Sequence, residues 1–112
     1  MLTIENLKEY GANVEEGLTR CMNNEALYLR LAGTIPAEGR FEALKKNIED
    51  RDLDSAFENA HALKGVTGNL SLTPLYDPLS KITELLRARE DTDYSELINE
   101  IISQKDRLSS LC

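Results

Sequence analysis

The chain contains one histidine, His61, and the residues that follow it form a pattern that could do chemistry. In a helix, Lys64 lies one turn further on at i+3, where its ammonium group can reach an anion attached to the imidazole. Gly65 and Gly68 come next, although each glycine inside a helix costs about 1 kcal/mol relative to alanine. A neutral imidazole is a competent nucleophile, and most histidine side chains are neutral near neutral pH. A nucleophilic histidine with a cation and open space beside it suits phosphoryl transfer.

Each of these residues also has an ordinary explanation. A lone histidine on a helix is usually a surface residue or a satisfied core residue. Lys64 taken alone is more often a solvated charge, and the two glycines could serve close packing against a neighbouring helix. The other explanation is that the glycines keep this strip bare so that a second protein can approach the imidazole. Lysine and glycine at i+3 and i+4, together with Gly68, favour this second explanation.

A helical wheel of residues 53–72 places His61 just outside the buried face. Gly65, Gly68 and Leu72 fall in the same strip as the histidine. We therefore expect the histidine to be partly exposed, with the edge of its ring resting on the bundle. The buried face takes seven side chains: Leu53, Ala56, Phe57, Ala60, Leu63, Thr67 and Leu70.

Helices are also predicted for the rest of the chain, because apolar residues recur at intervals of three and four and no segment alternates like a strand. The predicted helical segments are 3–10, 13–21, 25–33, 41–51, 53–72, 73–86 and 93–111. The residues from Gly33 to Gly39, which include Pro36, form the one clear loop. We therefore expect an all-α fold, with residues 1–112 in a single domain. Its architecture is predicted to be an antiparallel four-helix bundle with a short additional N-terminal helix.

Several of these helices begin with recognisable capping signals. Asn13–Glu16 and Asp93–Glu96 each match the capping box, in which the first side chain accepts the N–H of the third helical residue and the latter reaches back. Thr73–Pro74 matches an N-cap followed by proline at the first helical position. Pro78 is unfavourable inside a helix, so Asp77–Pro78 is an alternative start for the same segment.

Composition excludes several classes of function. The 112 residues include 20 acidic and 13 basic side chains, for a net charge of −7, so we expect neither a nucleic-acid partner nor an anionic membrane surface. No apolar run could span a membrane and no signal peptide is visible, which indicates a cytoplasmic protein. One histidine and two cysteines do not make a metal site; we expect Cys21 in the core and Cys112 as a free thiol. No glycine-rich phosphate loop is present, so we expect no kinase activity.

The segment His61–Leu70, with the sequence HALKGVTGNL, closely resembles the central motif of histidine-containing phosphotransfer (HPt) domains, H-x-L-K-G-x-[small]-x-x-L-G. Residues 13–18 and 25–29 look like the N-terminal helices of that family, and residues 52–60 look like its approach to the histidine. One position departs from the pattern, because Ser71 stands where the family usually has glycine. Since serine is small, we expect a modest change in helix packing and no loss of activity.

The resemblance implies a phosphorelay intermediate, a four-helix bundle that presents a phosphorylatable histidine to receiver domains. Carried over by position, His61 would accept the phosphoryl group through Nε2, Lys64 would stabilise the phosphoryl oxygens, and Gly65 would leave room for the receiver. Gly68 and Leu72 complete the predicted docking strip, with Leu75 and Tyr76 as further candidates that could equally belong to the core. The receiver would bring the Mg²⁺, so the chain itself is expected to need no cofactor.

Under this interpretation, the partners are receiver domains of response regulators and a sensor histidine kinase, and the chain is a monomer. Two alternatives stay open. One is a helical adaptor that docks on receivers or other signalling proteins without carrying phosphate. The other is a fragment of a larger sensor kinase, although the start at Met1 and the capped final helix favour a stand-alone protein.

Overall fold

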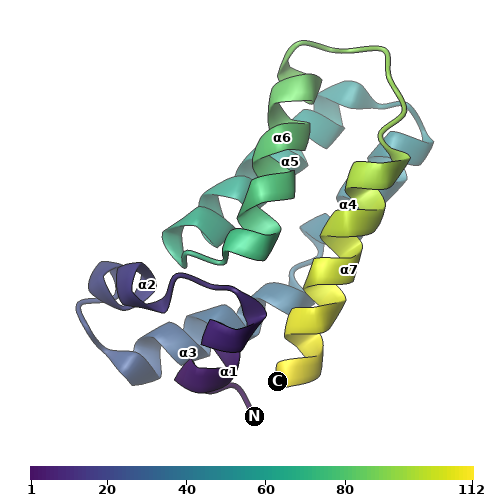
Figure 1. The fold of residues 1–112 in the computed structure, drawn as a ribbon. Coiled ribbons are helices and arrows are strands. Elements are labelled where there is room, and N and C mark those ends of the chain that lie inside the picture. Colours follow the sequence, from purple (N-terminus) through teal and green to yellow (C-terminus); the bar gives the residue numbers. More distant parts are fainter.

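The computed structural model describes all 112 residues, and its regular elements are all helices (Figure 1). Four short elements come first: α1 (Ile4–Tyr10), α2 (Val14–Arg20), α3 (Glu25–Thr34) and the 3-10 turn η1 (Ile35–Ala37). The four helices of the bundle follow: α4 (Arg40–Glu49), α5 (Leu53–Asn69), α6 (Thr73–Arg87) and α7 (Ser95–Leu111). Successive members of this second group run in opposite directions. The all-α class and the antiparallel four-helix bundle are therefore confirmed.

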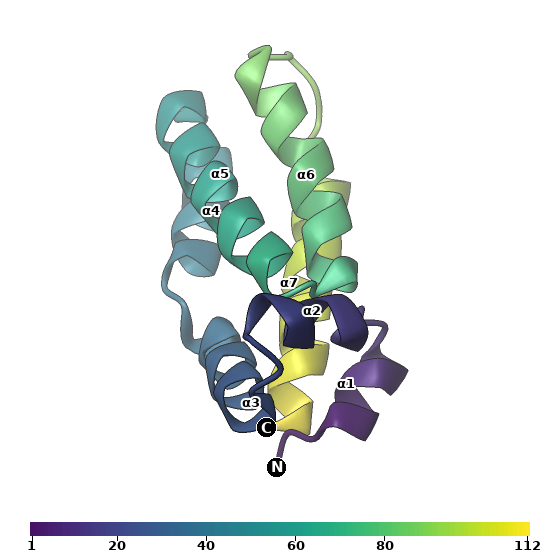
Figure 2. The same ribbon diagram turned by 90° about the vertical axis from the view of Figure 1, so that its left-hand side faces the viewer.

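The N-terminal third of the chain covers one end of the bundle. Figure 2 shows α2 lying across the ends of α5 and α6, with α1 and α3 on either side of it. The hydroxyl of Tyr28 on α3 donates to the carbonyl of Leu70 at 2.9 Å, and the N–H of Asn13 donates to the carbonyl of Ser71 at 2.9 Å. A Cβ on Gly17 would lie 2.5 Å from Cζ of Tyr28, so α2 can approach this ring only through a glycine. Three α-helices and a 3-10 turn precede the bundle, in agreement with the predicted segments 3–10, 13–21 and 25–33, although the expected architecture counted only one additional N-terminal helix.

Helix α5 ends at Asn69, three residues before the end that the wheel assumed. The N–H of Leu72 donates to the carbonyl of Thr67 at 3.0 Å, and Ser71 has a left-handed backbone with φ of 53°. This is the Schellman arrangement, whose left-handed residue is usually glycine. Ser71, at the position where the resemblance predicts glycine, is therefore the left-handed residue that ends α5. The sequence analysis expected this residue to change helix packing and did not predict its role at the helix end.

The capping pattern agrees with the sequence only in part. Asn13 accepts the N–H of Glu16 at 3.2 Å, as a capping box requires, but the Glu16 carboxylate accepts the hydroxyl of Ser71 at 3.0 Å instead of reaching back to the cap backbone. Before α7, Asp93 accepts the N–H of Ser95 at 2.9 Å, two residues on rather than three. The second capping box is therefore not formed.

Helix α6 begins at Thr73, the residue that was predicted to be its N-cap. Leu72 is the N-cap, and no side chain caps the helix. Pro74 lies in the first turn, where a missing N–H leaves no intrahelical hydrogen bond unmade. Pro78 lies inside the helix, so the alternative start at Asp77–Pro78 is wrong.

One apolar core runs through the molecule. It is a single cluster of 23 buried residues. On α5 the predicted buried face is confirmed at Ala56, Ala60, Leu63, Thr67 and Leu70. Leu53 and Phe57 are only half-buried. Cys21 is buried in the core and Cys112 is exposed, as expected, and both are free thiols.

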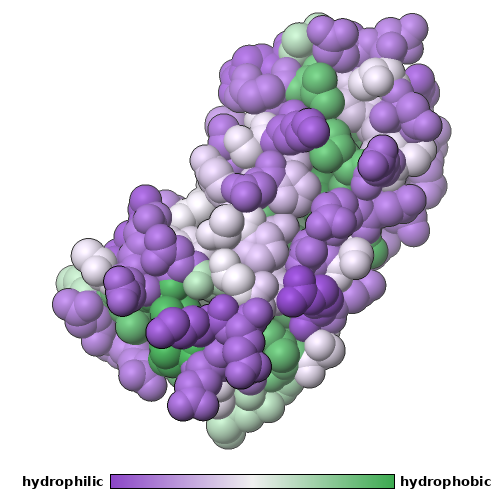
Figure 3. All heavy atoms as spheres, viewed as in Figure 1, coloured by the Kyte–Doolittle hydropathy of each residue, from purple (hydrophilic) through white to green (hydrophobic).

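The outer surface is mainly polar. In the view of Figure 1, hydrophilic residues cover most of the face and apolar residues show in small separate areas (Figure 3). Ion pairs link neighbouring helices: Lys105 of α7 lies 3.8 Å from Glu42 of α4, and Arg89 lies 2.7 Å from Asp54 of α5. Exposed pairs of this kind contribute at most about 1 kcal/mol each, so the core stabilises the bundle. No helix is long and apolar enough to cross a membrane.

Candidate functional site

His61 lies at the middle of α5, and its side chain is exposed. Its imidazole stacks on the ring of Phe57, one turn earlier, with a centroid distance of 5.6 Å and an interplanar angle of 18°. The guanidinium groups of Arg87 and Arg89 lie over the Phe57 ring, at 5.0 and 5.4 Å from its centroid. The imidazole therefore contacts the Phe57 ring with its face. The sequence analysis expected the edge of the imidazole to rest on the bundle instead.

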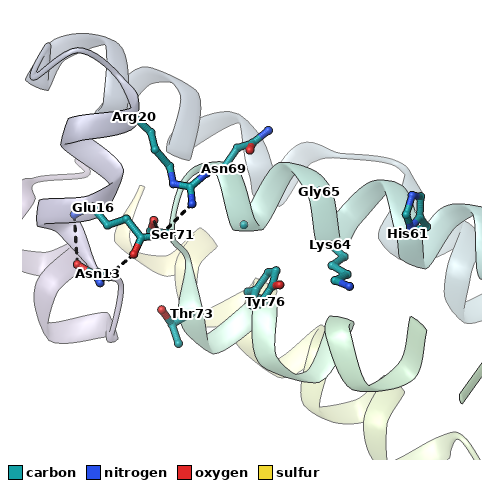
Figure 4. Close-up of a pocket in the computed structure, with 11 residues that line it drawn as sticks. Asn13, Glu16, Arg20, His61, Lys64, Gly65, Asn69, Ser71, Thr73 and Tyr76 are labelled. Carbon is teal, nitrogen blue, oxygen red and sulfur yellow. Dashed lines mark hydrogen bonds and ion pairs between the residues drawn. The ribbon is translucent and has the colours of Figure 1, made fainter. Parts of the chain in front are cut away.

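Lys64 extends toward α6 rather than along α5 toward the imidazole. Figure 4 shows the side chains of His61 and Lys64 leaving α5 on different sides. The Lys64 ammonium lies 3.9 Å from Oε1 of Glu84, and Oε2 of the same carboxylate lies 3.3 Å from the guanidinium of Arg87. Because an exposed ion pair of this length is worth at most about 1 kcal/mol, the lysine can leave Glu84 at small cost.

The two glycines of α5 have different surroundings. Gly65 is exposed, and a Cβ built on it meets nothing within 4 Å. A Cβ on Gly68 would lie 2.9 Å from Cε1 of Tyr76 on α6, which is closer than real Cβ contacts. Gly68 therefore permits close packing of α5 on α6. No intramolecular contact of this kind accounts for Gly65, and open access for a partner stays a prediction for this residue.

The structure removes two residues from the predicted docking strip. Leu72 and Leu75 are both fully buried, at 0% exposure. The wheel assigned Leu72 to the histidine strip because it assumed that α5 continues that far. The left-handed turn at Ser71 instead directs the chain into the core, so the docking assignment of Leu72 is wrong. Tyr76 stays partly exposed.

A polar groove of about 440 Å³ extends from His61 along α5 to α2 (Figure 4). Lys64, Gly65, Gly68 and Tyr76 line it near the histidine, and the other end carries Asn13, Glu16, Arg20, Asn69, Ser71 and Thr73. At that far end the Glu16 carboxylate lies 3.3 Å from the Arg20 guanidinium and accepts the hydroxyl of Ser71. The groove therefore joins the predicted site residues to a wall from α2.

Sequence analysis missed several residues around the site. The Phe57–His61 stack had a local signal, because aromatic side chains at i and i+4 meet on one helix face. Glu84, Arg87 and Arg20 had none, since only the tertiary fold brings α6 beside the histidine and α2 to the far end of the groove.

A family model described as "Hpt domain" matches residues 36–111. The chain belongs to the Hpt domain family. This confirms the resemblance seen in the sequence and gives the chain a role in histidine phosphotransfer in phosphorelay signalling. Hpt domains carry phosphoryl groups and are not kinases, and they typically interact with receiver domains and histidine kinases. Comparisons with curated proteins and with solved structures found no match.

The Hpt match begins inside η1, so α1, α2 and α3 lie outside it. These helices nevertheless cover the end of α5 and supply part of the groove beside the histidine. The surface around the site is therefore formed by the Hpt module together with residues 1–35, which the family model does not cover.

Proposed function

We propose that His61 is the phosphoryl-accepting residue of this Hpt domain. It takes the group from the aspartyl phosphate of one receiver domain and passes it to the aspartate of another. The observation that carries the proposal is the exposed imidazole of the only histidine, next to the bare backbone of Gly65. In this step the unprotonated Nε2 forms the N–P bond while the P–O bond to the aspartate breaks, and the carboxylate leaves with the bonding electrons. Transfer to the second receiver reverses the step.

The Phe57 stack supports this role because it orients the ring. A receiver must bring its phosphorylated aspartate in line with Nε2, and phosphoryl transfer depends mainly on positioning and charge stabilisation. The stack occupies one face of the imidazole and leaves its edge for the incoming phosphorus. The reaction's Mg²⁺ belongs to the receiver.

Lys64 is proposed to stabilise the phosphoryl oxygens after leaving Glu84. A phosphoryl group carries more negative charge than a carboxylate, so it competes well for the ammonium. The ion pair with Glu84 thus describes the resting position of Lys64, and phosphorylation of His61 would draw the side chain across α5.

The proposal has a direct test. The purified chain is mixed with a phosphorylated receiver domain and Mg²⁺ without ATP, and intact mass is followed. We expect one acid-labile phosphoryl group on the wild-type chain and none on His61→Gln, which should fold normally. Phosphate uptake by His61→Gln would overturn the site assignment. Binding of receivers without any transfer would favour the adaptor.

Residues 1–112 are proposed to act as one monomeric unit, because the N-terminal helices share the core of the bundle. Sedimentation of the purified chain tests this, and a stable dimer would overturn it. The sensor kinase and response regulators that exchange phosphate with this chain are to be found by testing receivers in the transfer assay.

A further inference from the structure

A second hollow lies beside α5, on the side away from Lys64, and it is apolar. Only four large apolar side chains are exposed, and two of them are methionines, Met1 and Met22. The other two are Leu31, 37% exposed, and Val66, 41% exposed, and both line this one hollow. These two exposed apolar residues come from different helices, α3 and α5, and share one concave surface. Isolated apolar residues on a protein surface need no explanation, but two that gather in one hollow do.

Leu70 and two residues of η1, Ile35 and Ala37, complete the apolar wall, and Glu38 and Gly39 form part of the rim. The hollow measures about 420 Å³, room for one or two apolar side chains of another protein. Leu31 and Ile35 lie before residue 36, where the Hpt match begins. The hollow is therefore made jointly by the Hpt module and the N-terminal helices.

The hollow is continuous with the face that carries His61. Asn69 lines both the polar groove and the apolar hollow, and Gly65, which has no side chain, directly precedes Val66. Val66 is five residues after the histidine, about 7.5 Å along the helix axis, on the other edge of the exposed face. Since a helix with side chains is about 10–12 Å wide, the two residues lie within about 14 Å of each other.

A protein interface of ordinary size covers about 800 Å² on each partner, a patch of about 16 Å radius. A receiver centred on Nε2 of His61 therefore extends over both edges of α5 and reaches the hollow. We propose that Leu31 and Val66 form the apolar anchor of the receiver-docking surface, and that an apolar side chain of the receiver enters the hollow. This inference rests on the proposed function of His61. It also assigns partner selection to α3, outside the matched Hpt module.

The test uses Leu31→Gln and Val66→Gln, because glutamine is a good helix former and adds no charge. Met22→Gln is the control: it removes another large apolar side chain, which is more exposed and lines neither the polar groove nor the apolar hollow. The probe is the receiver domain that exchanges phosphate with the wild-type chain or, if none does, the receiver that binds it most tightly. Kd for the receiver and the transfer rate at saturating receiver are both measured.

We expect Leu31→Gln and Val66→Gln each to raise Kd about tenfold, with the transfer rate at saturation unchanged, and Met22→Gln to leave both unchanged. His61→Gln should show a different pattern, in which transfer is abolished while the receiver still binds. Unaltered Kd in both hollow variants would overturn the docking inference while leaving the phosphoryl role intact. Concentration-dependent self-association that Leu31→Gln abolishes would show that a second copy occupies the hollow, and would also overturn it.

Discussion

Replacing each of the two α5 glycines by alanine should affect stability in opposite directions. At Gly65 the new methyl group enters open space, since nothing lies within 4 Å of its Cβ position. Alanine restricts the unfolded chain more than glycine does, and in a helix this is worth about 0.5–1 kcal/mol. We therefore expect Gly65→Ala to raise the free energy of unfolding by that amount, and Tm by about 4 °C per kcal/mol.

At Gly68 the same helix preference opposes a steric clash. The new Cβ would lie 2.9 Å from Cε1 and 3.1 Å from Cδ1 of Tyr76, so the ring or the helix must shift. Overpacking of this kind costs about 1–3 kcal/mol, and the helix gain offsets at most about 1 kcal/mol. We expect Gly68→Ala to lower the free energy of unfolding by about 1 kcal/mol. Removing the ring with Tyr76→Ala should convert the effect of Gly68→Ala into a gain.

Urea denaturation followed by far-UV circular dichroism measures all four variants and closes the double-mutant cycle. If Gly68→Ala has the same effect with and without the Tyr76 ring, or if both glycine variants stabilise equally, the packing argument is refuted. Gly65→Gln extends the test to function. It should keep or raise stability yet slow phosphoryl transfer by blocking the receiver, and normal transfer would remove the access argument for Gly65.

Three further perturbations test other parts of the structure. Ser71→Ala should lower the free energy of unfolding by about 1 kcal/mol, because it loses the hydrogen bond to Glu16. Ser71→Gly loses the same hydrogen bond but relieves the left-handed backbone, so its free energy of unfolding should be nearly unchanged. Urea denaturation of both variants tests this. Burial raises the pKa of Tyr28 to about 12, above its ordinary value of 10.0, so the unfolded chain loses this proton first and stability should fall as pH rises from about 10 to 12. Burial raises the pKa of Tyr10 and of Tyr94 as well, so Tyr28→Phe should reduce that alkaline decline without abolishing it. The variant should cost about 1 kcal/mol at neutral pH, and an unchanged alkaline slope would contradict the assignment. Glu84→Gln should free Lys64 and speed transfer to His61 about two- to fivefold, whereas Lys64→Ala should slow it, and equal rates in all three proteins would make the lysine a surface charge only.

Much of the site could be predicted because its key relations are local to one helix. Helix geometry alone makes the histidine, lysine and glycine at i, i+3 and i+4 neighbours on the helix surface, and it also predicts the buried stripe of α5. Capping residues and apolar periodicity likewise act over a few positions, which explains why the helices and the bundle class were predicted correctly.

Only the tertiary structure decided which way the side chains point and what faces them. Lys64 turns to Glu84, Gly68 meets Tyr76, and Leu72 enters the core, because α6 packs on α5 after a left-handed turn at Ser71. The hollow that Leu31 shares with Val66 pairs side chains that are 35 positions apart in the chain, and no periodicity can report such a contact. The sequence by itself singled out His61, the proposed phosphoryl acceptor, and predicted the helix that carries it. The surface on which a partner can dock depends on long-range packing, which local patterns do not encode.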